Sequence, residues 1–451
     1  MVKEDDYHPA VEFLLPVGSV KTLSISNYKF LNFHKANFAL INNKLLNSSW
    51  EKILSCTNLD TNILNFYNVL NSIISEFVPS GYRNTKFPRY FSSATIKIVK
   101  EKNKFHNKWK IYRNLRDFNT FKLLRSRSKR LIKEDYKNYI NYIEAEIPNN
   151  YKKFWQFVSV NRKSSNYPSD MFFENNSVSD NQSICNSFAK YFQSVFQPPS
   201  NINFQADSST SATEGLSHLQ LSKSEIVSVL RELDPQKGPG ADGVPAILAK
   251  QCATGLCLPL LKLFNQSLGS GVFPTIWKKT IAVPIFKSGD KRNIQNYRPI
   301  SKLCTFAKVF EKVVYKYIFS LVKNVIIPEQ HGFFANRSID SNLISYSQYI
   351  LNSLDDRVQV DSVYTDFSKA FDKIDHSLLI NKLSEIGVAG VVLDWFKSYL
   401  SCRENFVAIA DCSSDLFIPT SGVPQESHLS IIFVNDISKC FFLSTYFMQT
   451  T

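Results

Sequence analysis

Hydrophobic and polar positions follow a helical spacing over most of the stretch from about Phe30 to Phe196. Within it, Phe105, Trp109, Tyr112, Leu115 and Phe118 recur at steps of three and four, which places them on one face of a helix. Lysines and arginines fill the other faces, so the sequence predicts a basic amphipathic helix. The alternative is a solvated helix that packs on a core through its aromatic residues.

Residues 199–215, "PSNINFQADSSTSATEG", are rich in Ser, Thr and Asn and poor in apolar groups, which is typical of a flexible linker. The next segment, "LSKSEIVSVLREL", carries Ser222 and Glu225 at capping-box spacing and is predicted to be a helix. Its expected buried face comprises Ile226, Val229, Leu230 and Leu233. The helix should end in "DPQKGPGADG", where Pro and Gly break the pattern.

After Pro245 the pattern alternates between helices and short apolar strands. "TIAVPIF" is predicted to be a strand and "CTFAKVFEKVVYKYIFSLV" an amphipathic helix. "QVDSVYTDF" is predicted to be a strand that ends at an acid, and "HSLLINKLSEIGV" a helix. "RENFVAIADCSSDLFIPTSGVPQ" is expected to form a hairpin followed by a turn. Mixed strands and helices of this kind indicate an α+β fold.

Composition narrows the class of protein. A chain of 451 residues with 44% hydrophobic residues is long enough for two or three domains with cores of their own. Of the eight cysteines, only Cys252 and Cys257 lie close together, so neither a zinc site nor a disulfide framework is expected. No apolar run reaches the roughly 18 residues of a membrane span, and the first residues are acidic. We therefore expect an intracellular protein, cytoplasmic or nuclear, without a membrane anchor.

The net charge of +14 is concentrated in one segment. Residues 97–133 hold 14 Lys or Arg against 2 Asp or Glu, which is a net +12. Such a concentration attracts a polyanion, with nucleic acid as the expected partner and an anionic membrane as the alternative. The predicted contacts are Lys97, Lys100, Lys104, Lys108, Lys110, Arg113, Arg116, Arg125, Arg127, Lys129 and Arg130.

Asp366 ends an apolar strand in "SVYTDFSKAFDKIDH". A carboxylate in that position is costly unless something binds it, and Mg²⁺ prefers one or two carboxylates together with substrate phosphates. Two-metal nucleotidyl transfer requires acids from at least two chain segments, which hold ions about 3.5–4 Å apart. The alternative from the residues alone is that Asp366 caps the next helix.

Five short motifs favour the metal-binding role of Asp366 over helix capping: "KGPGADGVP", "NYRPISKL", "QHGFFANRSID", "YTDFSKAFDKIDH" and "SGVPQESHL". Their order and spacing over about residues 80–442 resemble those of a non-LTR (LINE-type, jockey-like) retrotransposon reverse transcriptase. The basic segment, with "NYKKFWQFV" and "FAKYFQSVF", is similar to the stretch that precedes the polymerase in these elements.

The resemblance implies an α+β fold with the fingers and a partial palm of a right-hand polymerase, preceded by a basic, mainly helical segment. The implied divisions are 1–30, a possible endonuclease remnant; 31–198, the basic helical region; 199–215, the linker; 216–360, the fingers; and 361–451, a partial, truncated palm. "DDYHPAVEF" resembles the last catalytic stretch of the endonuclease, with His8 and Asp5 or Asp6 as remnants; an ordinary exposed N-terminus is the alternative.

The resemblance also implies roles for single residues. Asp366 matches the first catalytic, metal-binding aspartate, with the carbonyl of Phe367 as a further Mg²⁺ ligand. Phe371 matches the aromatic residue that lies beneath the sugar and leaves no room for a 2′-hydroxyl. The implied partners are an RNA template, a DNA primer and deoxynucleoside triphosphates.

Nucleotide binding is implied for three further positions. Arg298 matches the arginine of the fingers that grips the incoming triphosphate, and Lys287, with Lys291 as the alternative, matches its lysine partner. A guanidinium fork and a point charge suit a triphosphate. Gln425, in the turn "SGVPQ", matches the segment that holds nucleotide and template.

The chain also departs from the family. Glu426 stands where the family's P-Q-G-S turn has glycine, and Phe334 stands where an arginine is usual. "HLSIIFVNDIS" is shorter than the family's stretch, and the Tyr-Ala-Asp-Asp hairpin and the thumb do not follow it. Asn435–Asp436 is not expected to replace that acid pair.

Asp372 and Asp375 are not expected to replace the second acid either, because they should cap the next helix or be solvated. We therefore expect a polypeptide that is a reverse transcriptase by family and inactive, or nearly so, as a polymerase. The alternative function is a non-catalytic nucleic-acid binder that uses residues 97–133. Two further alternatives are a group II intron-type maturase, which would need a splicing domain, and a decayed gene product, which would expose apolar surface.

Overall fold

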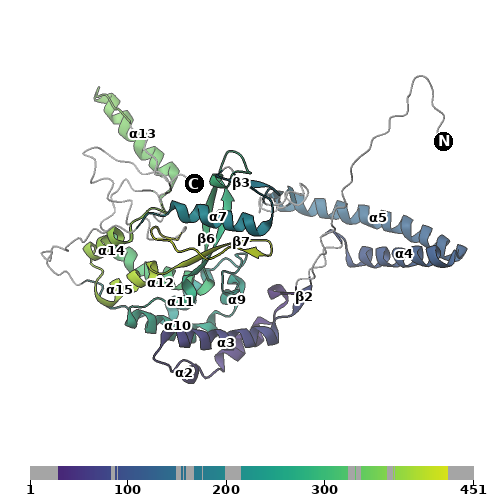
Figure 1. Ribbon diagram of the computed structural model, residues 1–451, viewed down its shortest axis with the longest axis horizontal. Helices are drawn as coiled ribbons and strands as arrows, with labels where there is room; N and C mark the ends of the chain where they lie inside the picture. The colour runs from purple at the N-terminus through teal and green to yellow at the C-terminus, as the bar shows by residue number, and fades with distance from the viewer. Residues whose placement is uncertain are drawn as a thin grey trace. The chain divides into compact units, whose positions relative to one another are not determined.

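The computed structural model describes residues 29–82, 87–88, 90–148, 154–155, 157–158, 167–174, 176–198, 215–323, 331, 337–362, 369 and 371–424. The chain divides into two compact units (Figure 1). Unit 1 comprises Met1–Asn32 and Ser80–Val158, and unit 2 comprises Phe33–Pro79 and Ser159–Thr451. The predicted linker at 199–215 lies outside the described residues except for Gly215.

Unit 1 is built around a pair of long helices. Strands β1 (Lys29–Leu31) and β2 (Ser80–Tyr82) pair antiparallel. Helix α4 (Ser93–Tyr112) packs lengthwise on α5 (Leu115–Glu146). The prediction of one continuous helix through residues 105–118 is wrong. Arg113 is left-handed, with φ of 51°, and Asn114 caps α5 by accepting a hydrogen bond from the backbone N–H of Arg116 at 2.9 Å.

The break places part of the predicted amphipathic face on the inside of a helical hairpin. Trp109 of α4 contacts Phe118 of α5 with ring centroids 4.9 Å apart, and His106 contacts Phe121 at 4.5 Å. The helical periodicity was therefore correct for Trp109 and Phe118, which pack inside the hairpin, whereas Tyr112 and Leu115 of the predicted face are exposed at its turn.

Unit 2 has a large helical core. It is formed by α1 (Phe38–Leu46), α2 (Trp50–Ile53), α3 (Leu59–Phe77), α8 (Lys223–Glu232), α9 (Ala246–Gln251), α10 (Ala253–Ser270), α11 (Thr275–Lys278), α12 (Thr305–Val322), α14 (His376–Glu385) and α15 (Gly390–Leu400). Helix α13 (Ile339–Asp355) is mostly exposed. Phe66 of α3 and Phe306 of α12 meet in this core at 5.4 Å. Residues 33–79 therefore share a core with residues that follow them by more than 200 positions.

The central sheet of unit 2 has the strand order β6-β5-β7-β8. Its strands are β5 (Lys279–Phe286), β6 (Tyr297–Lys302), β7 (Glu404–Ile409) and β8 (Cys412–Ser413). Strand β5 is antiparallel to β6 over Ile281–Phe286 and parallel to β7 over Lys279–Ala282. Pro284 lies beyond that parallel ladder, so its missing N–H removes no hydrogen bond to β7.

One face of this sheet is covered by α7 (Asn181–Val195). Phe188 and Phe192 of α7 are fully buried and pack with Ala282, Tyr297 and Val407 of the strands. A small hairpin of β3 (Met171–Phe173) and β4 (Asn176–Val178) joins the same cluster. The opposite sheet face contributes no residue to this cluster.

Most elements after residue 215 agree with their predictions. The Ser222–Glu225 capping box is present, Ile226, Val229 and Leu230 are buried, and Leu233 is partly buried. The predicted strand in "QVDSVYTDF" lies outside the described residues from position 363 on, and residues 359–362 have no regular structure. The mixed helix-and-sheet fold class is confirmed. Within the described residues, no helix is both long and apolar enough to cross a membrane.

The "GPGADG" loop is held against α3 by a buried hydrogen-bond chain. Tyr67 Oη donates to Asp242 Oδ2 at 2.8 Å and accepts a hydrogen bond from Trp277 Nε1 at 2.9 Å. Burial raises the pKa of Asp242 and, with the nearby Asp242 carboxylate, raises the pKa of Tyr67 well above its usual value. At Gly240 a Cβ atom would lie 2.5 Å from the carbonyl oxygen of Leu303, so only glycine fits there.

Candidate active site

The β5–β6 hairpin places Lys287 and Arg298 on the same side of the sheet. Arg298 pairs directly with Ile285, and the N–H of Lys287 donates to the carbonyl of Asn296 at 2.9 Å. Side chains two residues apart on a strand share a face, so Lys287 is the diagonal neighbour of Arg298. Both side chains are exposed, and within the described part of the chain neither forms an ion pair with an acid.

The alternative lysine, Lys291, is oriented differently. Its Nζ lies 5.5 Å from the centroid of the Phe286 ring, and Phe286 faces the buried side of the hairpin together with Tyr297. The geometry therefore favours Lys287 over Lys291 as the partner of Arg298.

The same register adds two cations that were not predicted. Lys279 shares the face of Ile285 and Lys287 on β5, and Lys302 shares the face of Arg298 on β6. Lys302 is partly buried, and burial together with the charge of Lys308 lowers its pKa. Alternation by two from Arg298 would have identified Lys302 in "YRPISK". The open sheet face thus carries four cations, which we call the cationic sheet face: Lys279, Lys287, Arg298 and Lys302.

Phe371 lies in a turn that is hydrogen-bonded to the turn at Gly422. We call these two connected turns the Phe371–Gly422 junction. The backbone N–H of Val423 donates to the Phe371 carbonyl at 2.9 Å, and that of Gly422 donates to the Ile374 carbonyl at 2.7 Å. Ser421 Oγ donates to the Asp372 carbonyl at 2.6 Å. These bonds bring together "FDKID" and "SGVP", which belong to two of the family's motifs, although they are 50 residues apart in sequence.

Two acids near this junction have structural roles. Asp375 caps α14, because its Oδ1 accepts a hydrogen bond from the backbone N–H of Leu378 at 2.9 Å, as predicted. Asp372 is 8% exposed, so the expectation that it is solvated is wrong. Gly422 packs against the backbone of Asp372: a Cβ on Gly422 would lie 2.8 Å from the Cα of Asp372.

His376 completes the junction. Its Nε2 lies 2.7 Å from the carbonyl oxygen of Gly422. Because a carbonyl oxygen only accepts hydrogen bonds, Nε2 carries the proton. Burial lowers the pKa of His376, opposed by the hydrogen bond to Gly422 and by the charge of Asp375.

Tyr191 of α7 connects the junction segment to the β5–β6 hairpin. Its Oη donates to the carbonyl of Gln295, just before β6, at 2.9 Å. Lys369 Nζ lies 4.8 Å from the centroid of the Tyr191 ring, and Lys369 has a left-handed backbone with φ of 57°. Lys369 follows Asp366 by three residues, so α7 links the hairpin to the segment of the predicted catalytic acid. No local sequence pattern indicated this role for Tyr191.

Several predicted site residues lie outside the described residues: Asp366, Phe367, Gln425, Glu426, Phe334 and Asp436. Within the described ranges no group of three or more His, Cys, Asp or Glu side chains is arranged to hold a metal ion. The described part of the site therefore consists of the cationic sheet face, the Phe371–Gly422 junction and Tyr191.

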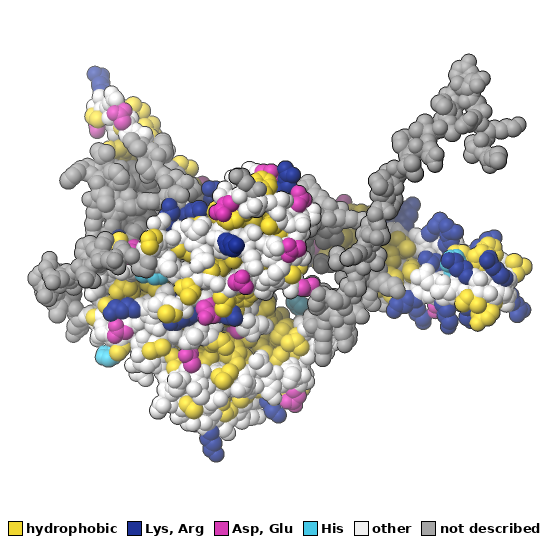
Figure 2. Space-filling view, viewed as in Figure 1, with side chains coloured by type: hydrophobic (Ala, Val, Ile, Leu, Met, Phe, Trp, Pro, Cys, Tyr) yellow, Lys and Arg dark blue, Asp and Glu magenta, His cyan; other side chains and the backbone are white. Residues whose placement is uncertain are grey.

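The predicted nucleic-acid contacts all lie on the α4–α5 hairpin of unit 1 or at its turn, and all of them are exposed: Lys97, Lys100, Lys104, Lys108, Lys110, Arg113, Arg116, Arg125, Arg127, Lys129 and Arg130. Arg130 Nε lies 3.6 Å from Glu134 Oε1. This exposed i, i+4 ion pair is weak, so it leaves Arg130 available to bind a phosphate. The Lys and Arg side chains are visible around this hairpin in Figure 2.

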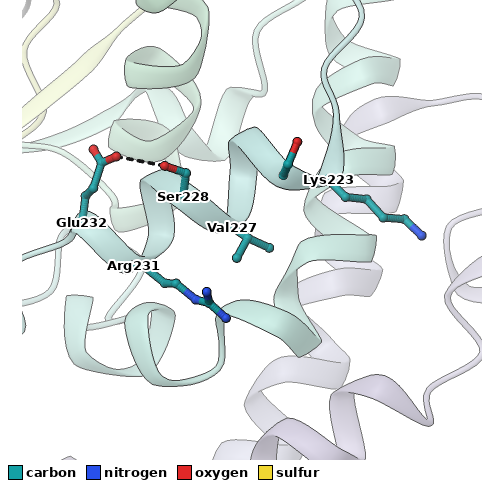
Figure 3. Close-up of a pocket in the computed structure, with 6 residues that line it drawn as sticks. Lys223, Val227, Ser228, Arg231 and Glu232 are labelled. Atoms are coloured by element: carbon teal, nitrogen blue, oxygen red, sulfur yellow. Dashed lines mark hydrogen bonds between the residues drawn. The ribbon is translucent and has the colours of Figure 1, made fainter.

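A hollow of about 650 Å³ lies on the surface of α8. Figure 3 shows Ser228 and Glu232 joined by a hydrogen bond on one side of that helix, with Val227 and Arg231 on another. Glu232 also pairs with Lys312 at 2.8 Å, which lowers its pKa. The hollow contains no residue implied by the family resemblance, so we do not regard it as the active site.

Comparison with known proteins agrees with the geometry. Residues 286–442 match the family model for reverse transcriptase (RNA-dependent DNA polymerase). The chain is 29% identical over 211 residues to a probable RNA-directed DNA polymerase from transposon BS of Drosophila melanogaster, covering 46% of this chain and 23% of that protein. It is 30% identical over 208 residues to a probable RNA-directed DNA polymerase from transposon X-element of the same organism, again 46% and 23%.

A third relative is a putative 115 kDa protein in type-1 retrotransposable element R1DM of Drosophila melanogaster, 27% identical over 228 residues, which are 47% of this chain and 20% of that protein. The chain thus matches less than a quarter of the length of each of these three relatives. The matched region contains Lys287, Arg298, Phe371 and Gly422. The chain therefore carries a reverse transcriptase domain that is similar to those of non-LTR retrotransposon proteins.

Proposed function

We propose that this domain binds an RNA template, a DNA primer and deoxynucleoside triphosphates, and that it adds deoxynucleotides to the primer. The observation that carries the proposal is the β5–β6 register, which gathers Lys279, Lys287, Arg298 and Lys302 on one open sheet face. Within the described residues none of these four cations forms an ion pair with an acid, and unpaired cations on one face suit a triphosphate and a template backbone. In this proposal the hairpin belongs to the fingers (216–360), and the Phe371–Gly422 junction belongs to the palm (361–451).

The proposed reaction is an in-line phosphoryl transfer. The primer 3′-hydroxyl loses its proton to solvent water and its oxygen forms a bond to the α-phosphorus, while the bond between the α-phosphorus and the oxygen that bridges to the β-phosphate breaks, so that pyrophosphate leaves. Arg298 and Lys287 hold the phosphates, Phe371 lies beneath the sugar, and Gln425 holds the nucleotide against the template. The Asp366 carboxylate and the Phe367 carbonyl are oxygen donors of the kind Mg²⁺ prefers. Bound Mg²⁺ would neutralise charge that develops on the phosphates.

We also propose that the 451-residue chain performs this reaction weakly. Glu426 follows Gln425 where the family has glycine, and a carboxylate there would repel the triphosphate and the template backbone. The prediction is testable in the same protein by Glu426→Gly, which should increase primer extension.

Nucleotide binding tests the site without requiring turnover. The purified chain would be titrated with a fluorescent deoxynucleoside triphosphate in the presence of template, primer and Mg²⁺. Arg298→Ala and Lys287→Ala should each weaken binding about tenfold or more, a loss of about 1.4 kcal/mol or more. Lys291→Ala is the matched control and should bind within about twofold of the parent. Equal losses for Lys291→Ala and Lys287→Ala would contradict the assignment from the register.

Primer extension tests the chemistry. Any extension on an RNA template with Mg²⁺ should disappear in Asp366→Asn and persist in Asp361→Asn, an exposed acid five residues earlier. Extension that survives Asp366→Asn would overturn the role proposed for Asp366.

A second function, nucleic-acid binding by the α4–α5 hairpin, is favoured by the exposure of all eleven predicted cations. Binding through phosphate neutralisation weakens with salt, because each contact releases condensed counterions. Replacing Lys97, Lys100, Lys104, Arg125, Lys129 and Arg130 with Gln should therefore reduce the slope of log K against log salt. An unchanged slope would exclude this hairpin as the binding surface.

A further inference from the structure

The turn of the α4–α5 hairpin exposes apolar side chains. Ile111, Tyr112 and Leu115 are 71%, 72% and 71% exposed. They lie within five residues of each other, on both sides of the reversal at Arg113–Asn114. Hydrophobic side chains are visible at this end of the hairpin in Figure 2. We call these three residues the tip.

The tip is not the margin of the hairpin's own interface. The ring contacts between α4 and α5 end at Trp109 and Phe118, and the Arg113 guanidinium lies 5.2 Å from the Trp109 ring and covers it. The interface therefore closes before the tip begins. Leu123 of α5 is exposed by itself, and a single exposed apolar residue is ordinary, but three within five residues mark an interaction surface.

The residues around the tip indicate the charge of its partner. Lys108, Lys110, Arg113 and Arg116 are all exposed next to it, and Asp117 is the nearby acid. A partner must therefore present negative charge around a group that an isoleucine, a tyrosine and a leucine can contact. Nucleic acid has this chemistry, because phosphates flank bases that stack on aromatic rings.

An anionic membrane carries the same sign of charge, but the hairpin suits it less well. A helix that lies in a membrane surface presents a long apolar face, whereas the aromatic stripe of α4 packs against α5. Only the short tip remains for lipid. By contrast, apolar side chains that insert between bases at a kink or an open end need an apolar surface no larger than the tip.

We propose that the tip binds unpaired or terminal bases of nucleic acid, with Tyr112 stacked on a base and Ile111 and Leu115 packed beside it. This inference rests on the second proposed function, in which the cations of the hairpin bind the phosphate backbone. It adds that the hairpin distinguishes open ends and junctions from continuous duplex.

The test uses the full chain and two probes of equal length. One probe is a duplex with a single-stranded overhang that carries 2-aminopurine at the junction, and the other is the same duplex with both ends closed by non-nucleotide linkers, so that it has neither unpaired bases nor open ends. Tyr112→Ser combined with Leu115→Ser should weaken binding to the overhang probe about tenfold and abolish the change in 2-aminopurine fluorescence. Binding to the closed probe should remain within about twofold, and the salt slope should be unchanged.

Tyr112→Phe is the matched control, because it keeps the ring and should behave as the parent chain does. All these side chains are exposed, so circular dichroism and the melting temperature should not change. Equal losses on both probes, or no loss on either, would overturn the role of the tip.

Two further outcomes separate this inference from the function on which it rests. If the six-cation variant weakens binding to both probes but the tip variant does not, the hairpin binds nucleic acid and only the tip proposal fails. If the tip variant loses binding to vesicles of phosphatidylserine and phosphatidylcholine while keeping its affinity for the overhang probe, the tip is a membrane contact and the proposal is wrong.

Discussion

Gly422 lies so close to the carbonyl of Phe371 that no residue with a Cβ atom fits at position 422. A Cβ atom on Gly422 would lie 2.5 Å from the Phe371 carbonyl oxygen, the same oxygen that accepts the hydrogen bond of Val423. The backbone of Gly422 is also left-handed, with φ of 82°. Steric fit and backbone conformation therefore both require glycine at position 422, where two of the family's motifs are in contact.

Gly422→Ala should destabilise the protein by about 3 kcal/mol or more. A left-handed alanine costs about 1–2 kcal/mol, and the overlap with Phe371 must be relieved by moving the junction. The measurement is the free energy of unfolding in urea. Gly243→Ala is the matched control: its φ is 74° but a Cβ there would meet nothing within 4 Å. If both variants lose the same free energy, close contact with Phe371 is not what selects glycine at position 422.

The junction should weaken on acidification through His376. Its pKa is lowered in the folded protein from the usual 6.5, so the unfolded chain binds more protons than the folded chain as the pH falls through about 6.5. The unfolding free energy should therefore decrease from about pH 8 to about pH 5.5. The difference between the parent chain and His376→Gln, whose amide can still donate to Gly422 but does not titrate, isolates this contribution. Parallel pH profiles for the two proteins would contradict it.

The sequence predicted the elements of unit 2 well because their patterns are local. The Ser222–Glu225 capping box and the strand "TIAVPIF" are each specified within a few residues, and both are present. Arg298 and Lys287 were identified by resemblance, and the strand register then placed them on one face. Local patterns thus identified residues, and pairing between segments was needed to decide between Lys287 and Lys291.

The reversal at Arg113 illustrates what local patterns miss. The apolar period continues from Trp109 to Phe118 across the turn, since both residues face the hairpin interface. Neither Arg113 nor Asn114 is Gly or Pro, so the sequence carried no strong break. Asn is, however, a favoured N-cap, and that signal could have located the start of α5.

Tyr191 could not be assigned from the sequence because the two contacts that link it to the site come from distant segments, at Gln295 and Lys369. Tyr191→Leu removes both contacts and should weaken triphosphate binding several-fold, while Tyr191→Phe keeps the ring beneath Lys369 and should lose less. Binding of a fluorescent deoxynucleotide measures this.

The matched control for Tyr191 is Tyr167→Leu. The Tyr167 hydroxyl donates to the Pro284 carbonyl of the same hairpin at 2.9 Å, and its ring packs against the same buried cluster. If Tyr167→Leu weakens nucleotide binding as much as Tyr191→Leu, support of the hairpin explains the effect and the contact with Lys369 does not.

The Tyr67 hydroxyl connects α3 to the "GPGADG" loop across 175 residues of sequence. Tyr67→Phe should lower the free energy of unfolding by about 2–4 kcal/mol, because it leaves the buried Asp242 carboxylate and the buried Trp277 N–H without this partner. Tyr112→Phe, at an exposed position, should change it by less than about 0.5 kcal/mol. Asp242→Asn combined with Tyr67→Phe should cost less than the sum of the single changes, since both remove the same hydrogen bond. Additive losses in urea unfolding would mean that Tyr67 and Asp242 stabilise the protein independently.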